Sequence, residues 1–241
     1  MGYRVSVVIP AYNESRTVAS TVRAARAGVE ASGFACEVLV VDDGSTDKTA
    51  AHAASAGARV VSLRRRSGKG AALTEGVRLA TDGIVAFLDA DVGEGASEVG
   101  KLIAPIARGE ADMAVARLPQ PPRGTGGLGI VKAVAGLGIR CLSGLRVSAP
   151  LSGQRAARRE MLLGLAPFAS GFGVEVALTI DAARRGYRVL EVDCGMSHRD
   201  TGRDLAGFVH RSRQLYWVVR ALGGRLVSAM RAAPWRGGPG R

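Results

Sequence analysis

Short apolar runs alternate with helix-length segments along the first 92 residues of the chain. The runs occupy residues 4–9, 37–41, 59–63 and 84–88. Such alternation is typical of βαβ units, in which helices cover both faces of a parallel sheet. We therefore predict an α/β fold with a mostly parallel central sheet flanked by helices.

Polar residues follow each of these four runs, where the predicted strands end. They are Asn13 and Glu14, Asp42 and Asp43, Lys69, and Asp89 and Asp91. The carboxyl ends of parallel strands lie at one edge of a sheet, and open α/β sheets bind their ligands there. We expect these loops to converge on one ligand site.

The last of the four runs ends in two carboxylates that are separated by a single small residue, Ala90. Carboxylates this close repel one another unless a positive charge lies between them. A hard divalent cation that carries a phosphate group suits Asp89 and Asp91. A pair of loop acids without a ligand is the alternative, because Asp is common in turns.

The charge balance favours anionic partners. Lys and Arg number 33 against 21 Asp and Glu, which gives a net charge of +12. A basic surface of this size suits sugar nucleotides, phosphorylated acceptors, anionic lipid or nucleic acid, unless it only reflects an arginine-rich coding bias. Aromatic residues make up only 5% of the chain, which argues against stacking on single-stranded nucleic acid, so we expect no nucleic-acid partner.

The cysteine pattern favours a reducing compartment. The three cysteines, Cys36, Cys141 and Cys194, lie far apart and show no metal-ligand spacing. No signal peptide is evident, and no apolar run reaches the ~20 residues of a membrane span. We expect a cytoplasmic protein that could lie at the inner face of the membrane.

The second half of the chain has a less regular pattern. We predict helices at residues 97–108, 130–142, 158–165 and 173–185, strands at 111–116 and 187–192, a loop at 118–129 and irregular structure at 148–157. From residue 205 the pattern is that of one amphipathic helix, which Gly223 and Gly224 should interrupt. Such a helix either lies on an anionic membrane surface or covers the core or a second subunit of a homodimer.

Four blocks of the first half resemble glycosyltransferase family 2. They are residues 8–14 (VIPAYNE), 40–47 (VVDDGSTD), 68–73 (GKGAAL) and 88–91 (LDAD), and they follow the order and approximate spacing of that family. The resemblance implies a single GT-A (Rossmann-like) domain over residues 1–234. Its parts would be a nucleotide-sugar half (1–117), an acceptor half (118–204) and a C-terminal helix (205–234), followed by a flexible tail (235–241).

The resemblance also implies roles for residues of the first half. The nucleotide-binding residues would be Pro10, Ala11, Tyr12, Glu14, Asp42, Gly68, Lys69, Asp89 and Ala90. Asp91 would act in catalysis as a ligand of Mg²⁺ or Mn²⁺, which stabilises a leaving nucleoside diphosphate.

In the second half, residues 150–160 resemble the acceptor-side loop of glucosyl-3-phosphoglycerate synthases and of polyprenyl-phosphate sugar synthases. The implied acceptor-binding residues are Ser152, Gly153, Gln154, Arg155, Arg199 and Arg203. His198 would be the second metal ligand. Either Glu175 or Asp200 could be the general base. Glu175 could instead only stabilise the start of a helix through its favourable interaction with the helix dipole.

The resemblance implies a metal-dependent glycosyltransferase that takes its sugar from a nucleotide donor, UDP-glucose before GDP-mannose. The acceptor would be a phosphorylated small molecule or a hydroxyl compound, or alternatively a polyprenyl phosphate at the membrane surface. Two alternatives of another class are a nucleotidyltransferase and a non-catalytic nucleotide-binding domain. A nucleotidyltransferase would carry a glycine-rich phosphate loop after the first strand, where residues 10–14 read PAYNE.

Overall fold

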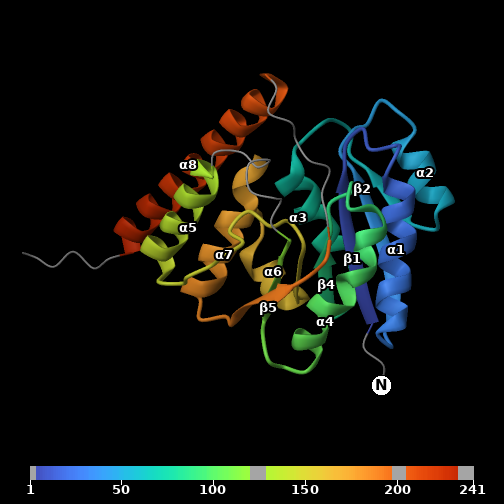
Figure 1. The fold of residues 1–241 in the computed structure, drawn as a ribbon, viewed down its shortest axis with the longest axis horizontal. Helices are drawn as coiled ribbons and strands as arrows, with labels where there is room; N and C mark the ends of the chain where they lie inside the picture. Colours follow the sequence, from blue (N-terminus) through green and yellow to red (C-terminus); the bar gives the residue numbers. More distant parts are fainter. Residues whose placement is uncertain (1–3, 120–128, 197–204, 233–241) are drawn as a thin grey trace, which may run out of the picture.

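The computed structural model describes residues 4–119, 129–196 and 205–232, with the backbone alone at 205–211 and 228–232. A single sheet of seven strands runs through it in the order β3-β2-β1-β4-β6-β5-β7 (Figure 1). The strands are β1 (Arg4–Ala11), β2 (Ala35–Asp42), β3 (Arg59–Ser62), β4 (Ile84–Phe87), β5 (Met113–Arg117), β6 (Arg155–Arg158) and β7 (Val189–Asp193). Only β6 pairs antiparallel with its neighbours, so the predicted α/β fold with a mostly parallel sheet is confirmed.

Helices connect the strands and cover both faces of the sheet (Figure 1). They are α1 (Val18–Ala31), α2 (Thr49–Ser55), α3 (Lys69–Leu79), α4 (Val99–Ala107), α5 (Ile130–Ser143), α6 (Arg159–Leu165), α7 (Val174–Arg184) and α8 (Leu205–Ala232), with 3₁₀ turns η1 (Gly93–Glu98) and η2 (Gly171–Gly173). None of the helices in the described part of the chain is long and apolar enough to cross a bilayer.

The core has a layer on each face of the sheet because successive strand residues point to opposite sides. Val7 of β1 packs in the layer under α1 and α4. Val8 packs in the opposite layer, with side chains of α3, α6 and α7. This two-sided burial explains why the strands are continuous apolar runs.

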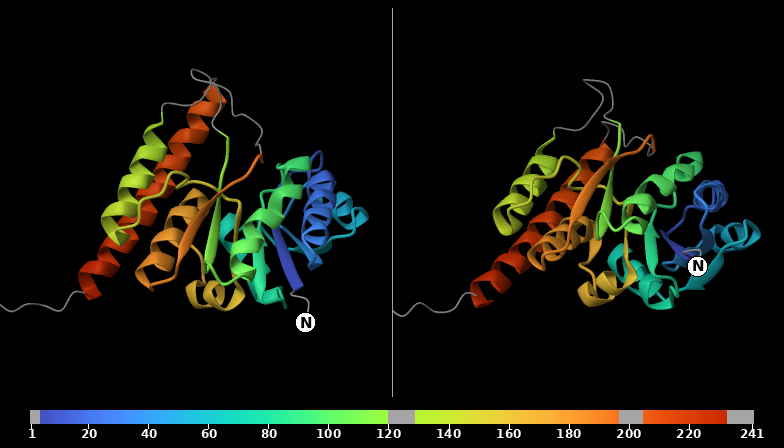
Figure 2. Two further views of the ribbon diagram at one scale, coloured as in Figure 1. Left: turned by 60° about the horizontal axis from the view of Figure 1, so that its bottom comes forward. Right: turned by 90° about the horizontal axis from the view of Figure 1, so that it is seen from below.

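A third cluster joins α5, α7 and α8 beside the second layer. Ile139 of α5, Ile180 of α7 and Val218 of α8 are fully buried in it. In Figures 1 and 2, α5 and α8 lie side by side at the end of the molecule away from α1 and α2. The predicted C-terminal amphipathic helix is therefore present and packs against the domain.

One local prediction for the second half of the chain is wrong. Residues 148–157 were expected to be irregular, but β6 begins at Arg155 and pairs with β4 and β5. The helix expected at 97–108 is confirmed, since α4 spans Val99–Ala107 directly after the 3₁₀ turn η1.

The glycine pair of the last helix does not interrupt it. Helix α8 runs unbroken through Gly223 and Gly224. A glycine inside a helix costs only about 1 kcal/mol, and packing of α8 against α5, α7 and η2 offsets that cost.

Candidate active site

Backbone–side-chain hydrogen bonds join the loops after β2 and β3. Asp43 is buried, and its two carboxylate oxygens accept hydrogen bonds from the backbone N–H groups of Ser67 and Gly68, at 2.6 and 2.8 Å. Asp42, the last residue of β2, is also buried and accepts hydrogen bonds from Ser45 N (3.0 Å) and Ser62 Oγ (3.2 Å). The carboxylates therefore fix the backbone around the predicted nucleotide site.

A strained turn after β1 presents Tyr12 at the same edge. Asn13 has a φ of 57°, a left-handed conformation that is rare outside glycine. Its Oδ1 accepts a hydrogen bond from Thr46 N (2.9 Å), and its own N–H donates to Ser45 Oγ (2.9 Å), which holds the turn. The Tyr12 ring lies against Arg66, whose guanidinium carbon is 3.9 Å from the ring centroid. The flanking Ala11 is buried at the end of β1.

Lys69 is placed between two carboxylates from distant parts of the chain. Its Nζ lies 2.6 Å from Asp89 Oδ1 and 2.7 Å from Glu175 Oε1. Lys69 opens α3, Asp89 follows β4, and Glu175 lies in the first turn of α7. Burial disfavours the ammonium charge, but the two carboxylates outweigh it and raise the pKa of Lys69 above its ordinary value.

Gln154 and Gly153 fit closely around this cluster. Gln154 is fully buried, its Oε1 accepts a hydrogen bond from Asp89 N, and its Nε2 donates to Asp89 Oδ2, both at 2.9 Å. A Cβ atom at Gly153 would lie 2.6 Å from Asp89 Oδ2 and 2.7 Å from Lys69 Nζ, so a larger residue there would displace these two side chains. These two residues were predicted to bind the acceptor, and the structure brings them to Asp89.

Arg155 is a second buried cation beside the cluster. Its side chain donates hydrogen bonds to the Ser152 carbonyl and to Thr179 Oγ1, both at 2.8 Å. Burial lowers the pKa of Arg155 to about 10, although the negative charges of Glu175 and Asp89 act to raise it. Arg155 Nη2 and Ser152 Oγ are buried without a hydrogen-bond partner among the described residues. Thr179, which also donates to the Glu175 carbonyl, carried no signal in the sequence.

Of the two predicted metal ligands, Asp91 and His198, the structure describes only Asp91. Asp91 lies in the turn after β4, partly exposed, at the same edge of the sheet. Over the described part of the chain, no three His, Cys, Asp or Glu side chains gather into a metal-binding group. His198, Arg199, Asp200 and Arg203 lie outside the described residues, so their roles stay predictions.

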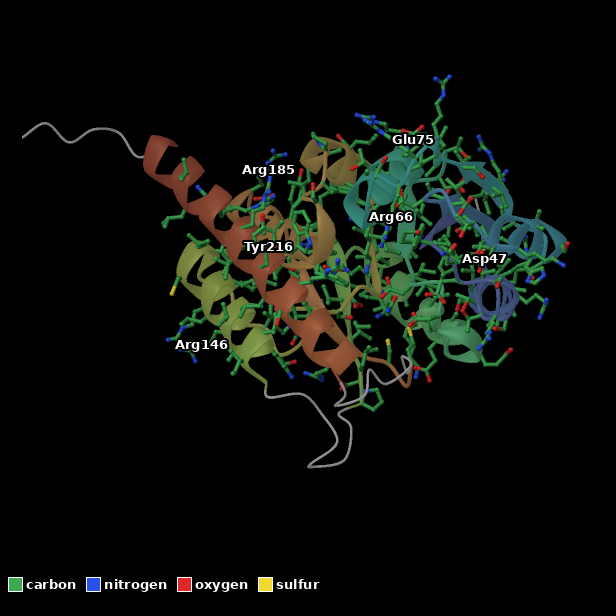
Figure 3. The ribbon with its side chains drawn as sticks, turned by 90° about the horizontal axis from the view of Figure 1, so that it is seen from above. Asp47, Arg66, Glu75, Arg146, Arg185 and Tyr216 are labelled. Carbon is green, nitrogen blue, oxygen red and sulfur yellow. The ribbon has the colours of Figure 1, made fainter. Side chains whose placement is uncertain are left out.

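The segment that carries the acceptor-side loop is anchored by a residue that the sequence pattern did not single out. Glu191 of β7 accepts hydrogen bonds from Ser148 N, Ser148 Oγ and Ala149 N, between 2.6 and 3.0 Å. These bonds lower the pKa of Glu191 against the opposing effect of its burial. Figure 3 views the molecule from above, with Arg66 between Asp47 and Tyr216 of α8.

Curated relatives support the resemblance seen in the sequence. Residues 6–162 match the family described as glycosyl transferase family 2. The chain is 35% identical to glucosyl-3-phosphoglycerate synthase of Mycobacterium tuberculosis (strain H37Rv) over 236 residues, which cover 87% of this chain and 71% of the relative. The same enzyme of Mycolicibacterium smegmatis is also 35% identical, over 89% of this chain and 76% of the relative.

Solved structures show the same likeness. Glucosyl-3-phosphoglycerate synthase of M. tuberculosis in complex with phosphoglyceric acid matches with a TM-score of 0.76 at 32% identity, over 93% of this chain and 80% of that one. The complex of that enzyme with Mn²⁺, UDP and glucosyl-3-phosphoglycerate matches with a TM-score of 0.75 at 31% identity. This match also covers 93% of this chain and 80% of that one.

These matches cover both halves of the chain. They decide against a nucleotidyltransferase. The chain belongs to glycosyltransferase family 2 and is a nucleotide-sugar-dependent glycosyltransferase with the GT-A fold.

Proposed function

We propose that the chain transfers glucose from UDP-glucose to a phosphoglycerate-like acceptor with the help of Mn²⁺ or Mg²⁺. The observation that carries this proposal is the cluster of Lys69, Asp89 and Glu175, which joins the donor side of the sheet to α7. Relatives that are 35% identical are named glucosyl-3-phosphoglycerate synthases, and a structure of one holds Mn²⁺ and UDP.

On the donor side, the loops after β1 and β2 would receive the nucleoside. Asp42 is fixed by Ser45 and Ser62 and can still accept a hydrogen bond from a base N–H or a ribose hydroxyl. Lys69 holds Asp89 in place, so that its carboxylate faces the same site. Pro10, Glu14 and Ala90 complete the predicted contacts.

Asp91 and His198 are the residues that would hold the metal ion. A carboxylate oxygen combined with an imidazole nitrogen suits Mn²⁺ as well as Mg²⁺. Both oxygens of Asp89 contact Lys69 or Gln154. The bound ion would supply positive charge to the diphosphate of the leaving UDP.

On the acceptor side, Glu175 is placed by α7, and its carboxylate contacts Lys69 Nζ at 2.7 Å. A carboxylate at this point can accept a hydrogen bond from the acceptor hydroxyl, or take its proton if it serves as the base. Arg155 Nη2 and Ser152 Oγ are donors that suit a phosphate or carboxylate group of the acceptor. Arg199, Asp200 and Arg203 stay predictions for the same side.

Other parts of the interpretation also remain predictions. They are the boundary at residues 117 and 118 between the donor and acceptor halves, GDP-mannose as a donor and a polyprenyl-phosphate acceptor. Membrane contact and a homodimer formed through α8 are also predictions. The sequence motivates each of them, and the experiment below separates the acceptors.

A product assay tests the proposal. Purified enzyme is incubated with UDP-glucose or GDP-mannose, with 3-phosphoglycerate or a short polyprenyl phosphate, and with Mn²⁺, Mg²⁺ or EDTA. We expect a glucosylated phosphoglycerate from UDP-glucose, formed only with a metal. A product from polyprenyl phosphate alone, or none from phosphoglycerate, would contradict the proposal.

Two matched variants complete that assay. Glu175 and Glu160 both lie in the first turn of a helix, but Glu160 is exposed. We expect Glu175→Gln to lower kcat about 100-fold, the size of effect seen when one catalytic contact is removed. Glu160→Gln should keep kcat within about twofold of wild type, because substitutions of exposed residues usually change the protein little.

A further inference from the structure

Tyr12 and Arg66 form a contact that joins the loop after β1 to the loop after β3. The guanidinium carbon of Arg66 lies 3.9 Å from the centre of the Tyr12 ring, within the range of a cation–π interaction. Tyr12 is half-buried, whereas Arg66 is exposed. The turn after β2, which contains Asp43 and Gly44, lies beside this contact.

Both sides of the pair are held by backbone contacts. Arg66 follows a stretch whose backbone passes so close to Gly44 that a Cβ there would lie 3.2 Å from Arg66 N. Just beyond it, the N–H groups of Ser67 and Gly68 donate to Asp43. On the other side, Asn13 holds its strained conformation directly after Tyr12.

The contact matters because an exposed arginine has many rotamers to lose. Fixing such a side chain costs up to about 2 kcal/mol of conformational entropy, which a ligand must otherwise supply. A ring that already holds the guanidinium in place removes part of that cost before a ligand arrives. Arg64 and Arg65, in the same basic run, have no such ring contact among the described residues.

We propose that Tyr12 positions Arg66 as a donor-binding cation that contacts the phosphates of the nucleoside diphosphate. The proposal rests on the function proposed above and adds a specific residue pair to it. Arg66 lies three residues before Lys69 and at the edge of the sheet where the loops after β1, β2 and β3 meet. A guanidinium there can donate two parallel hydrogen bonds to phosphate oxygens.

Calorimetric titration with UDP, UMP and uridine in the presence of Mn²⁺ tests the proposal. We expect Arg66→Ala to weaken UDP binding about tenfold, the effect of losing one hydrogen bond to a charged group. Uridine, which has no phosphate, should bind Arg66→Ala and wild type equally. Arg64→Ala is the matched control and should change UDP binding less than twofold.

Variants of Tyr12 test the positioning role. Tyr12→Phe keeps an aromatic face and should bind UDP within twofold of wild type, whereas Tyr12→Leu should bind it about two- to fivefold more weakly. In the double variant Tyr12→Leu/Arg66→Ala the two losses should not add, because the ring acts through the arginine. Thermal melting of each variant controls for folding.

Two outcomes would overturn the inference, and they are distinguishable from a failure of the proposed function. Arg66→Ala could bind UDP as Arg64→Ala does, or it could lose uridine and UDP equally. In either case wild type still binds UDP and the proposed function stands. If wild type binds no UDP, the proposed function fails and the inference fails with it.

Discussion

Lys69 is the residue on which the charge balance of the site depends. It lies within 2.7 Å of two carboxylates, Asp89 and Glu175, and Glu175 is almost fully buried. Without the ammonium group these carboxylates would face one another in a poorly hydrated place. The same cation therefore supports the fold and pairs with both carboxylates of the site.

Replacement of Lys69 by Met should lower both activity and stability. We expect kcat to fall about 100-fold, and the free energy of unfolding to fall by about 1–3 kcal/mol because charged groups lose their partner. Chemical denaturation measures the stability. The double variant Lys69→Met/Glu175→Gln should recover part of the stability and none of the activity.

Lys132→Met is the control, since Lys132 is exposed on α5. It should leave both quantities unchanged. A Lys69→Met enzyme with wild-type stability would contradict the account of the cluster.

The cysteines should differ sharply in reactivity. Burial raises the pKa of Cys36 to about 12 and that of Cys194 to about 11, whereas Cys141 is exposed on α5. At pH 8 less than about 1% of either raised thiol is thiolate, the reactive form. We expect iodoacetamide to label Cys141 first in the native protein, as measured by mass spectrometry of peptides.

Denatured protein provides the reference for that labelling, and all three cysteines should then react. Equal labelling rates of Cys36 and Cys141 in the folded enzyme would contradict the partly buried position of Cys36.

At the residue scale, the sequence identified Lys69, Asp89 and Asp91 because family motifs carry them. It could not indicate that Gln154 and Gly153 close around Asp89, because that contact joins positions 65 residues apart. Thr179 was missed for the same reason: a threonine inside a helix has no pattern that points to Arg155.

At the scale of elements, close helix approaches depend on particular glycines. Gly28 of α1 packs against the backbone of η1, where a Cβ would lie 2.1 Å from the Ser97 carbonyl oxygen. Backbone atoms cannot move aside as a flexible side chain can. Gly136 of α5, by contrast, has open space around its Cα.

Gly28→Ala and Gly136→Ala should therefore have effects of opposite sign. We expect the first to destabilise the protein by about 2–3 kcal/mol through overpacking. The second should stabilise it by about 0.5–1 kcal/mol, because alanine is the better helix former. Urea denaturation of both variants measures the difference, and a neutral Gly28→Ala would show that α1 and η1 are further apart than described.

Elements with a strong apolar pattern were predictable, and those held by tertiary contacts were not. Strands β1 and β4 were evident as apolar runs. Strand β6 was not, since its sequence RAAR has two arginines and two alanines. Its alanines are buried because each packs into the core layer on one face of the sheet. The continuity of α8 through Gly223 likewise depends on its packing against α5 and η2.

At the scale of the whole molecule, the sheet order explains why one edge collects the chemistry. Strands β1, β2 and β4 are parallel neighbours, so their carboxyl ends bring the first loops and the Asp89–Asp91 pair together. Helix α7 then adds Glu175 from the other half of the chain. The alternation of strands and helices predicted this edge, but not the way in which the second half closes on it.

Calorimetric titration of UDP with and without Mn²⁺ tests the central claim most directly. The proteins compared are wild type, Asp91→Ala and, as the control, Glu94→Ala. The carboxylate of Glu94 is exposed on η1, three residues after Asp91. We predict at least tenfold tighter binding with Mn²⁺ in wild type and in Glu94→Ala, and loss of that difference in Asp91→Ala. UDP binding to wild type that does not depend on the metal, or no binding at all, would contradict the account.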